Sequence, residues 1–249
     1  MNFNGKVVLV TGASAGIGKA ACILFAKNGA KVAINDIVES DTLIEVNKYS
    51  EGIFLKGDVS DPADAKSVVQ RTIAQFGRLD ILVNNAGIVV PGRIDNTEED
   101  DWDRTMRINL KGIYLMSREA VSQMKEQGAG VIVNTSSSVA LKGVKDRAAY
   151  SASKGGVLSL TRAMAADYMD WGIRVNCICP GTTMTPSLEK RLAAFEDPEK
   201  ARQEFIARQP MKILGKPEEI AYAIMFASCD EAKFMNGSAL SIDGGMTCC

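Results

Sequence analysis

The chain has 249 residues, with 29 basic and 30 acidic side chains and no histidine. The balanced charge, with no run of lysine or arginine, argues against partners such as nucleic acid or a membrane surface. The missing histidine excludes Ser-His-Asp and Cys-His triads and histidine-ligated zinc, so we expect no metal centre and a different proton-transfer group.

Strand-like and helix-like segments alternate along the chain. Short apolar, β-branched runs predict seven strands, at Lys6–Val10, Lys31–Asn35, Ile53–Lys56, Asp80–Val83, Gly130–Asn134, Ile173–Ile178 and Ala239–Ile242. Helical patterns lie between them, at Ala20–Asn28, 61–76, 98–127, Tyr150–Asp170 and Pro217–Ser228. Short apolar strands separated by helices predict an α/β fold, in which helices cover both faces of a parallel sheet.

No linker-like tract or repeat divides the chain, so we expect residues 1–249 to form a single domain. The section 182–215 differs from the rest because it is polar, rich in charge and contains a helix set off by Pro186 and Pro198. An insertion of this length is more often a lid or a binding element than a plain connector. We therefore expect this section to carry the substrate specificity.

The sequence also indicates a cellular setting. No segment approaches the ~20 apolar residues of a membrane span, and the start of the chain does not resemble a signal peptide. The six cysteines form no C-x-x-C pair. We expect a reduced protein in the cytoplasm.

Three glycines, Gly12, Gly16 and Gly18, follow the first predicted strand. In a dinucleotide-binding turn, the first allows the tight turn, the second lets the backbone approach a pyrophosphate, and the third permits close helix–sheet packing. The helix that follows would offer free N–H groups and a positive dipole end to the phosphates. The pattern predicts a dinucleotide cofactor.

Asp36 lies at the end of the second predicted strand and indicates which dinucleotide binds. A carboxylate there can accept hydrogen bonds from both ribose hydroxyls of NAD and would repel the 2′-phosphate of NADP. Its neighbour Ile37 and the turn residue Ala15 are uncharged, so no basic side chain awaits that phosphate. The sequence therefore favours NAD.

Tyr150 and Lys154 are four residues apart in a predicted helix and share one of its faces. Tyrosine titrates near ~10, too high for a good base at neutral pH. A nearby ammonium favours the phenolate and is expected to lower that pKa. This pair can supply what the absent histidine would have supplied.

These features are part of a longer series of motifs. In chain order they are Thr11-Gly12-x-x-x-Gly16-x-Gly18, Asn84-Asn85-Ala86-Gly87, Asn109, Ser137, Tyr150-x-x-x-Lys154, Pro180-Gly181 and Asp243-Gly244-Gly245. Over essentially the whole chain, the series resembles the short-chain dehydrogenase/reductase family. The resemblance implies a Rossmann-like, doubly wound sheet of order 3-2-1-4-5-6-7, NAD-linked interconversion of a secondary alcohol and a ketone, and a homotetramer.

The resemblance also implies residue roles. Tyr150 would exchange the hydroxyl proton during hydride transfer, while Lys154 would lower the tyrosine pKa and hold the nicotinamide ribose. Ser137 would polarise the substrate oxygen, and Asn109 would hold a water in a proton relay that reaches Lys154. The implied cofactor-binding residues are Gly12, Ser14, Gly16, Ile17, Gly18, Asp36, Asp58, Val59, Asn85, Ala86, Gly87, Tyr150, Lys154, Pro180, Gly181, Thr183 and Thr185.

Taken without the resemblance, several of these residues have simpler interpretations. Asn109 could cap or kink its helix, Ser137 could be a loop hydroxyl, and Thr185 could cap a helix in the 182–215 section. Asn84 is better explained as a brace for the fourth strand than as a cofactor ligand.

Three arginines, Arg147, Arg191 and Arg208, point to the substrate. Each alone is best explained as a solvated surface side chain, but converging guanidinium groups suit a carboxylate. Their spacing resembles that of the cytosolic type 2 3-hydroxybutyrate dehydrogenases and related sugar-acid dehydrogenases, whose carboxylate-binding arginines match these positions. The resemblance implies a small carboxylate-bearing substrate, such as a 3-hydroxy acid or a ketodeoxy sugar acid.

Other activities share the same motifs. A 3-oxoacyl carrier-protein reductase usually prefers NADP and carries basic residues for its acidic carrier, so Asp36 and Trp171 argue against it. A dehydrogenase of a neutral polyol or a hydroxysteroid is a further alternative. A non-catalytic NAD sensor typically loses the tyrosine or the lysine, and both Tyr150 and Lys154 are present.

Overall fold

Residues 1–248 are described by the structure, a computed structural model, and they contain one parallel sheet in the order β3-β2-β1-β4-β5-β6-β7. The strands are β1 (Val7–Thr11), β2 (Lys31–Asp36), β3 (Gly52–Lys56), β4 (Ile81–Asn84), β5 (Gly130–Thr135), β6 (Ile173–Pro180) and β7 (Ala239–Ile242). The predicted fold class, strand number and strand order are confirmed.

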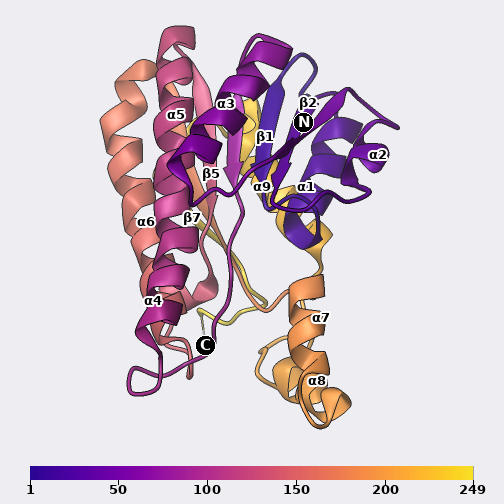
Figure 1. Ribbon diagram of the computed structural model, residues 1–249, viewed down its shortest axis with the longest axis vertical. Helices are drawn as coiled ribbons and strands as arrows, with labels where there is room; N and C mark the ends of the chain where they lie inside the picture. The colour runs from indigo at the N-terminus through magenta and orange to yellow at the C-terminus, as the bar shows by residue number, and fades with distance from the viewer. Residues whose placement is uncertain (249) are drawn as a thin grey trace.

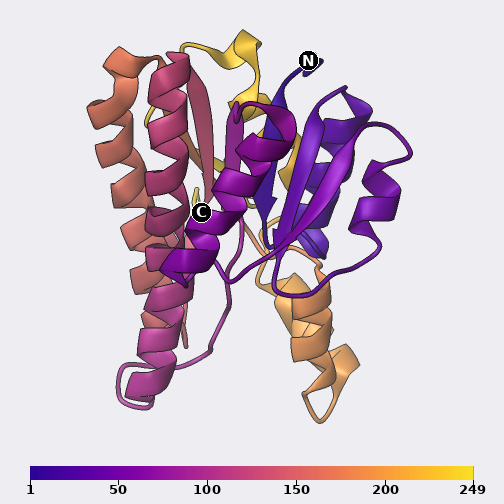
Figure 2. The ribbon, with the colours of Figure 1, turned by 45° about the horizontal axis from the view of Figure 1, so that its top comes forward.

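Helices cover both faces of this sheet (Figures 1 and 2). They are α1 (Gly16–Lys27), α2 (Thr42–Val46), α3 (Pro62–Phe76), α4 (Glu99–Met106), α5 (Gly112–Gln127), α6 (Ala148–Tyr168), α7 (Pro186–Ala193), α8 (Pro198–Ala207) and α9 (Pro217–Ser228). A π-helical turn, η1 (Arg107–Lys111), joins α4 to α5.

The two faces follow from the alternation of side chains along each strand. On β1, Val8 and Val10 pack in the cluster that includes Phe25 of α1 and Ile224 of α9. Leu9, between them, packs on the opposite side with Met116 of α5 and other residues of α3, α5 and α6. Because all five side chains are buried, β1 reads as a continuous apolar run rather than an alternating one.

The strand order places the ligand crevice. β1 pairs with β2 on one side and with β4 on the other, so the chain reverses its direction of winding at β1. In open α/β sheets, ligands bind outside the carboxyl ends of the strands at such a reversal. The site is therefore expected where β1 and β4 end.

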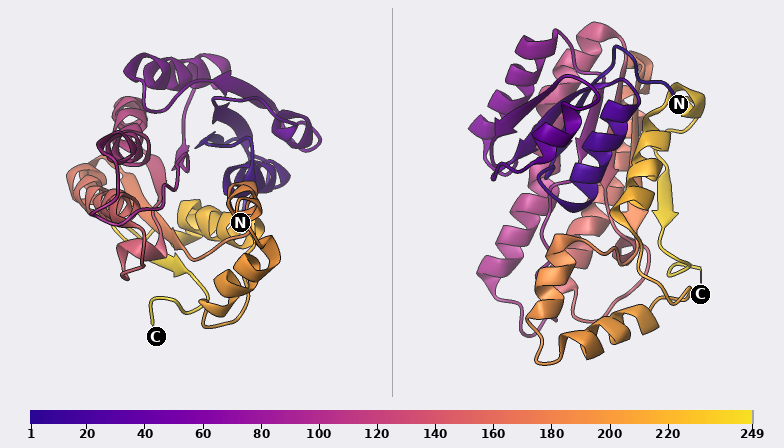
Figure 3. Two further views of the ribbon diagram at one scale, coloured as in Figure 1. Left: turned by 60° about the horizontal axis from the view of Figure 1, so that its bottom comes forward. Right: turned by 90° about the vertical axis from the view of Figure 1, so that its right-hand side faces the viewer.

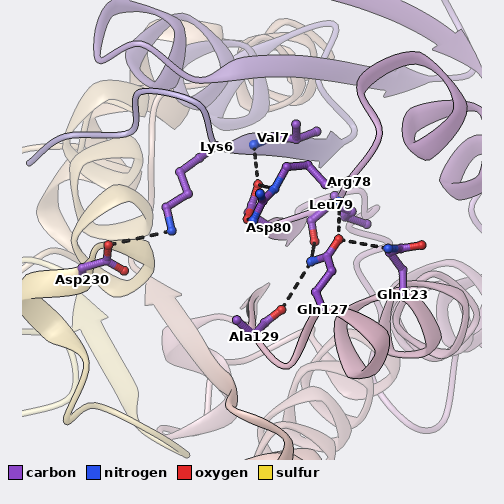
Figure 4. Close-up of polar contacts among 9 residues, drawn as sticks. All are labelled: Lys6, Val7, Arg78, Leu79, Asp80, Gln123, Gln127, Ala129 and Asp230. Atoms are coloured by element: carbon purple, nitrogen blue, oxygen red, sulfur yellow. Dashed lines mark hydrogen bonds and ion pairs between the residues drawn. The ribbon is translucent and has the colours of Figure 1, made fainter.

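At the opposite end of the central strands, where β1 and β4 begin, a polar network holds the chain together (Figure 4). Asp80 accepts hydrogen bonds from the Val7 N–H (2.8 Å) and from two guanidinium nitrogens of Arg78 (2.9 and 2.6 Å). Gln127, at the end of α5, bonds both the N–H and the carbonyl of Leu79 (3.0 and 2.9 Å). These contacts align the starts of β1 and β4 with α5.

Two helices near the amino terminus differ from expectation. The first is predicted from Ala20, but α1 begins at Gly16 and includes Gly18. The short α2 was not predicted, since five residues carry no periodic signal. Tertiary contact holds it in place, because the Thr42 hydroxyl donates to the Ala13 carbonyl at 3.1 Å.

The section 182–215 contains two helices rather than the single one expected, α7 and α8. Each begins with a proline, and each has a side-chain cap: Thr185 accepts from the Leu188 N–H and Asp197 from the Lys200 N–H. The pair has a small apolar core of its own, made by Leu188, Leu192, Ala201 and Phe205. It projects from the body of the molecule (Figure 3), and we call residues 182–215 the lid.

Within residues 1–248, no helix is both long enough and apolar enough to cross a bilayer.

Candidate active site

A cleft opens at the carboxyl ends of the central strands, and it has two connected parts. The inner pocket encloses about 240 Å³ and is lined by Ser137, Tyr150, Lys154 and residues of the lid. The outer cleft encloses about 370 Å³ and is lined by the glycine turn after β1 and by Asp36. Both parts share the lining residues Ile17, Asn85, Gly87, Ile88, Thr185 and Ser187.

The glycine turn is shaped so that backbone, and not side chain, faces the outer cleft. Gly12 has a φ of +62°, and a Cβ there would lie 2.7 Å from the Cα of Ala86. Gly16 has a φ of +55°, and a Cβ would lie 3.2 Å from Cγ2 of Thr185. The helix that follows has no side-chain cap at Ala15 and no acidic residue in its first turn. Its free N–H groups are suited to an anion.

Asparagines brace this turn from β4. The Thr11 hydroxyl accepts from the N–H groups of Asn85 (3.0 Å) and Ala86 (3.1 Å). The Asn85 amide donates back to the carbonyls of Thr11 and Gly12 (3.0 and 3.1 Å). Asn84 instead bonds Asn134 across the sheet at 2.9 Å, which confirms that it braces the strand.

Asp36 ends β2 at the rim of the outer cleft. Its carboxylate accepts from the N–H of Ser14 (2.9 Å) and from the N–H of Ile37 (2.8 Å), which fixes its orientation. A carboxylate has about four acceptor positions, so others are open to a ligand. No lysine or arginine occurs among the described residues that line this cleft.

The predicted cofactor set maps onto the cleft with two exceptions. The Ser14 hydroxyl donates to the Val38 carbonyl and Gly18 is buried, and neither residue is among the lining of the inner pocket or the outer cleft. Fifteen of the predicted residues do line the inner pocket or the outer cleft: Gly12, Gly16, Ile17, Asp36, Asp58, Val59, Asn85, Ala86, Gly87, Tyr150, Lys154, Pro180, Gly181, Thr183 and Thr185.

The inner pocket brings Ser137, Tyr150 and Lys154 together. Ser137 lies just beyond β5, and its hydroxyl is close enough to the phenol of Tyr150 on α6 to lower the pKa of that phenol. One turn further along α6, Lys154 is buried and its ammonium donates to the Thr135 carbonyl at 2.6 Å. The three groups form one wall of the pocket.

The pKa values of this wall follow from desolvation. Burial lowers the pKa of Lys154 from 10.5 to about 8. Burial also raises the pKa of Tyr150, while the hydrogen bond from Ser137 and the charges of Arg191 and Arg147 act to lower it. The expectation of a lowered tyrosine pKa is wrong for the chain by itself, because desolvation outweighs the nearby positive charges.

Asn109 lies in the π-helical turn η1 and is fully buried. Its side chain accepts from the Ile88 N–H (2.8 Å) and donates to the Ile88 carbonyl (2.9 Å) and to the Ser153 hydroxyl (3.1 Å). It therefore fastens the segment after β4 to α6 and does not line the pocket. The kink anticipated at this residue is present as the π-turn, and its role in a proton relay stays a prediction.

All three predicted arginines line the inner pocket: Arg147 before α6, Arg191 on α7 and Arg208 after α8. Burial lowers the pKa of Arg147, and the charge of Arg208 lowers it further. The pKa of Arg191 is lowered by burial and by the charge of Arg147. No aspartate or glutamate occurs among the described lining residues, so the pocket is strongly cationic.

Several lining residues of the inner pocket were not anticipated from the sequence. Thr185 was expected and also caps α7, so both interpretations of that residue hold. Gln209, Phe205 and Met246 were missed. Gln209 follows Phe205 by four residues and so shares its helical face, but a single polar residue on an apolar face is too weak a signal to interpret.

Comparison with known proteins finds related oxidoreductases and reductases over nearly the whole chain. A family model described as enoyl-(acyl carrier protein) reductase matches residues 12–247. An uncharacterized oxidoreductase of Thermotoga maritima is 55% identical, with 99% of each chain covered. Dehydrogenase/reductase SDR family member 6 of Aquarana catesbeiana is 42% identical, with 97% of each covered. Among solved structures, levodione reductase is 35% identical and superposes with a TM-score of 0.96 over 99% of both chains.

Proposed function

Because the chain belongs to the short-chain dehydrogenase/reductase family of oxidoreductases, we propose that it is an NAD-dependent enzyme that interconverts a small hydroxy acid and its ketone. One observation carries the proposal. The inner pocket holds Ser137 and Tyr150 beside three arginines, and no acidic residue occurs among its described lining residues.

The outer cleft fits NAD(P), the cofactor type of this family. When bound, NAD⁺ supplies the hydride acceptor for alcohol oxidation. The turn at Gly12 and Gly16 would receive the pyrophosphate at the start of α1, and Asp36 would accept the adenosine ribose hydroxyls. Lys154 would hold the nicotinamide ribose, and Thr185 the carboxamide. The negative Asp36, with no basic residue among the described lining, favours NAD over NADP.

Ser137 and Tyr150 would act on the substrate hydroxyl from one side of the pocket. In oxidation, the O–H bond breaks as the Tyr150 oxygen takes the proton, the C–H bond breaks as hydride leaves, and a C=O bond forms. Ser137 donates a hydrogen bond that orients the substrate oxygen and stabilises its developing charge. Since burial raises the pKa of Tyr150, the phenolate depends on the hydrogen bond from Ser137 and on the positive charges of Arg191 and Arg147, which lower that pKa.

The arginines would bind the substrate carboxylate. Arg147 and Arg191 each have a pKa lowered mainly by burial and further by a neighbouring guanidinium group, so part of the shift is a repulsion that an anion would relieve. Guanidinium binds carboxylate through paired hydrogen bonds, which also fixes the orientation of the bound acid. The carbinol carbon would then lie against Tyr150.

An NAD-reduction assay tests this proposal. Hydroxy acids are compared with their neutral amides, in the wild type, in Arg147→Ala and in Arg208→Ala. We expect only the acids to be good substrates, with KM raised roughly 10–100-fold in both variants, as for the loss of a charged hydrogen bond. Arg202→Ala is the matched control, because Arg202 is on the same helix as Phe205 but lines a separate surface depression. Equal activity on neutral alcohols, with no loss in Arg147→Ala, would overturn the proposal.

A 3-oxoacyl-[acyl-carrier-protein] reductase FabG of Thermotoga maritima, 40% identical with 99% of each chain covered, supports a second candidate, reduction of the 3-oxo group of an acyl chain on a carrier protein. The same assay separates the two activities. Strong preference for NADPH and turnover of a 3-oxoacyl thioester would favour the carrier-protein reductase over the hydroxy acid dehydrogenase.

We also propose that the protein is a homotetramer and that each subunit is a single domain. Tyr222 and Phe226 support it, because both are large, exposed side chains on the outer surface of α9 beside the edge strand β7. Light scattering tests the assembly, and a single cooperative unfolding transition tests the domain organisation.

A further inference from the structure

We propose that Gln209 binds a second hydroxyl group of the substrate, so that the pocket selects polyhydroxy acids over simple hydroxy fatty acids. The inference rests on the proposed function, because it concerns the same pocket, and it narrows the class of acid that the pocket takes.

Gln209 is held in place at the base of the lid. Only 3% of its surface is exposed, and its side chain lines the inner pocket directly after Arg208. Its amide nitrogen donates to the Phe205 carbonyl at 3.1 Å and to the Thr182 hydroxyl at 2.9 Å. These bonds tie the end of α8 to the first residue of the lid.

The same bonds fix which way the amide faces. The Phe205 carbonyl can only accept, so the group facing it must be the nitrogen, and Oε1 of Gln209 lies on the other side. Both amide protons are then used within the protein. The oxygen is the free end of the group.

That oxygen is open to the pocket. In residues 1–248, the buried side-chain atoms that lack a partner are Asn35 Oδ1, Asn84 Oδ1, Thr105 Oγ1, Thr135 Oγ1 and Arg191 Nε. Oε1 of Gln209 is not among them, and no described protein group donates to it. The oxygen is therefore accessible and unpaired on a residue that lines the pocket, and we infer that it faces the pocket interior.

The chemistry of the pocket defines the group that would bind there. A carbonyl oxygen needs a hydrogen-bond donor, which on a small acid is a hydroxyl or an ammonium. Three arginines and Lys154 line the pocket, without an acid among the described lining residues, so an ammonium would be repelled. A hydroxyl carries no such penalty. It cannot be the reacting one, which lies at Ser137 and Tyr150, so the substrate needs a second.

Matched substrates test the inference. The kcat/KM values for NAD reduction are measured with 3-hydroxybutyrate against 3,4-dihydroxybutyrate, and with gluconate against its monodeoxy analogues. In the wild type, we expect at least one hydroxylated acid to exceed its deoxy partner by roughly tenfold or more, because a site built to bond a hydroxyl rejects the analogue that lacks it. If every pair is within twofold, the inference is wrong, whichever variants fold.

Two variants separate recognition from support of the lid. Gln209→Met has a similar volume but no carbonyl, and we expect its preference for the hydroxylated acid to fall below about threefold. Thr182→Val removes an acceptor of the amide while leaving Oε1 in place, so the preference should persist even if KM changes. Equal loss of preference in both variants would assign Gln209 a purely structural role.

The remaining outcomes are also decisive. Preference for an amino acid analogue over the hydroxylated acid would overturn the choice of hydroxyl. If no acid is oxidised, the proposed function fails, yet calorimetric binding of the same pairs to Tyr150→Phe still tests Gln209. Equal affinities for hydroxylated and deoxy acids there would overturn the inference.

Discussion

The ammonium of Lys154 lies 5.8 Å from the centre of the Tyr150 ring. It is anchored by the Thr135 carbonyl rather than by any carboxylate, so its charge is held close to the phenol without being neutralised by a protein acid. Desolvation acts on the two groups in opposite directions, raising the pKa of the tyrosine and lowering that of the lysine. Burial thus drives both groups towards their neutral forms.

Tyr150→Phe removes the proposed proton acceptor while keeping the ring. We expect turnover to fall roughly 10²–10⁴-fold, the usual contribution of a positioned acid–base group. NADH affinity, measured by fluorescence titration, should stay within a few-fold, since the ring and Lys154 are unchanged. Tyr49→Phe is the control, because Tyr49 is exposed and far from the pocket lining. Undiminished turnover in Tyr150→Phe would remove the tyrosine from the mechanism.

The lowered pKa of Lys154 predicts a pH dependence of stability. Its pKa is about 8 in the folded chain against an ordinary value of 10.5, so between these values the unfolded chain holds more protons. The free energy of unfolding should therefore rise with pH over this range, by roughly 3 kcal/mol at most, and this gain is lost as pH falls through 8.

Lys154→Met isolates that contribution from other titrating groups. Urea denaturation of both proteins between pH 7 and 10.5 gives the difference in their unfolding free energies. We expect the wild type to gain on the variant as pH rises. A difference independent of pH would show that the lysine titrates normally.

Asp36→Asn tests the choice of cofactor. The amide oxygen still accepts from the Ser14 N–H, while the negative charge that would repel a 2′-phosphate is gone. We expect the ratio of kcat/KM for NADP to that for NAD to rise roughly 10–100-fold, the worth of a hydrogen bond to a charged group. Glu39→Gln, in the exposed turn after β2, is the control and should leave the ratio unchanged.

Gly12→Ala tests the glycine turn. The residue has a left-handed φ of +62°, and its new Cβ would overlap the backbone of Ala86. We expect the free energy of unfolding to fall by roughly 3 kcal/mol, measured by urea denaturation, from backbone strain and overpacking together. Gly143→Ala is the control, because a Cβ there meets nothing within 4 Å. Equal stabilities of the two variants would contradict this account of the turn.

Much of the architecture is predictable because each signal is local. Buried parallel strands carry continuous apolar runs, as in Val7 to Val10 of β1, and proline or a capping residue marks where α3, α7 and α9 begin. Signals fail where tertiary contact decides the outcome. α1 starts at Gly16, since the turn against Ala86 requires glycine whatever its helix propensity, and α2 is held through Thr42.

The features of the candidate site also divide into those that the sequence predicts and those that only the folded structure reveals. Residues that follow strand ends, such as Ser137 and Asp36, could be placed from spacing, because carboxyl ends of parallel strands meet at one edge. The raised pKa of Tyr150 could not be predicted, since it depends on how far the folded chain removes the phenol from water. The unpaired oxygen of Gln209 could not be predicted from the sequence either, because it depends on which neighbouring groups accept the amide protons.

The way in which the lid is joined to the sheet allows residues of the lid to change with little effect on the sheet. Its two ends meet at the Thr183–Gly215 bridge, and the apolar side chains of α7 and α8 pack mainly on one another. Substitutions on its pocket side, at Arg191, Arg208 or Gln209, therefore leave the packing of the sheet untouched. If the proposed function holds, new substrates can be acquired by changing these pocket-side residues of the lid, while Thr185, the cofactor turn and the Tyr150–Lys154 pair are inherited unaltered.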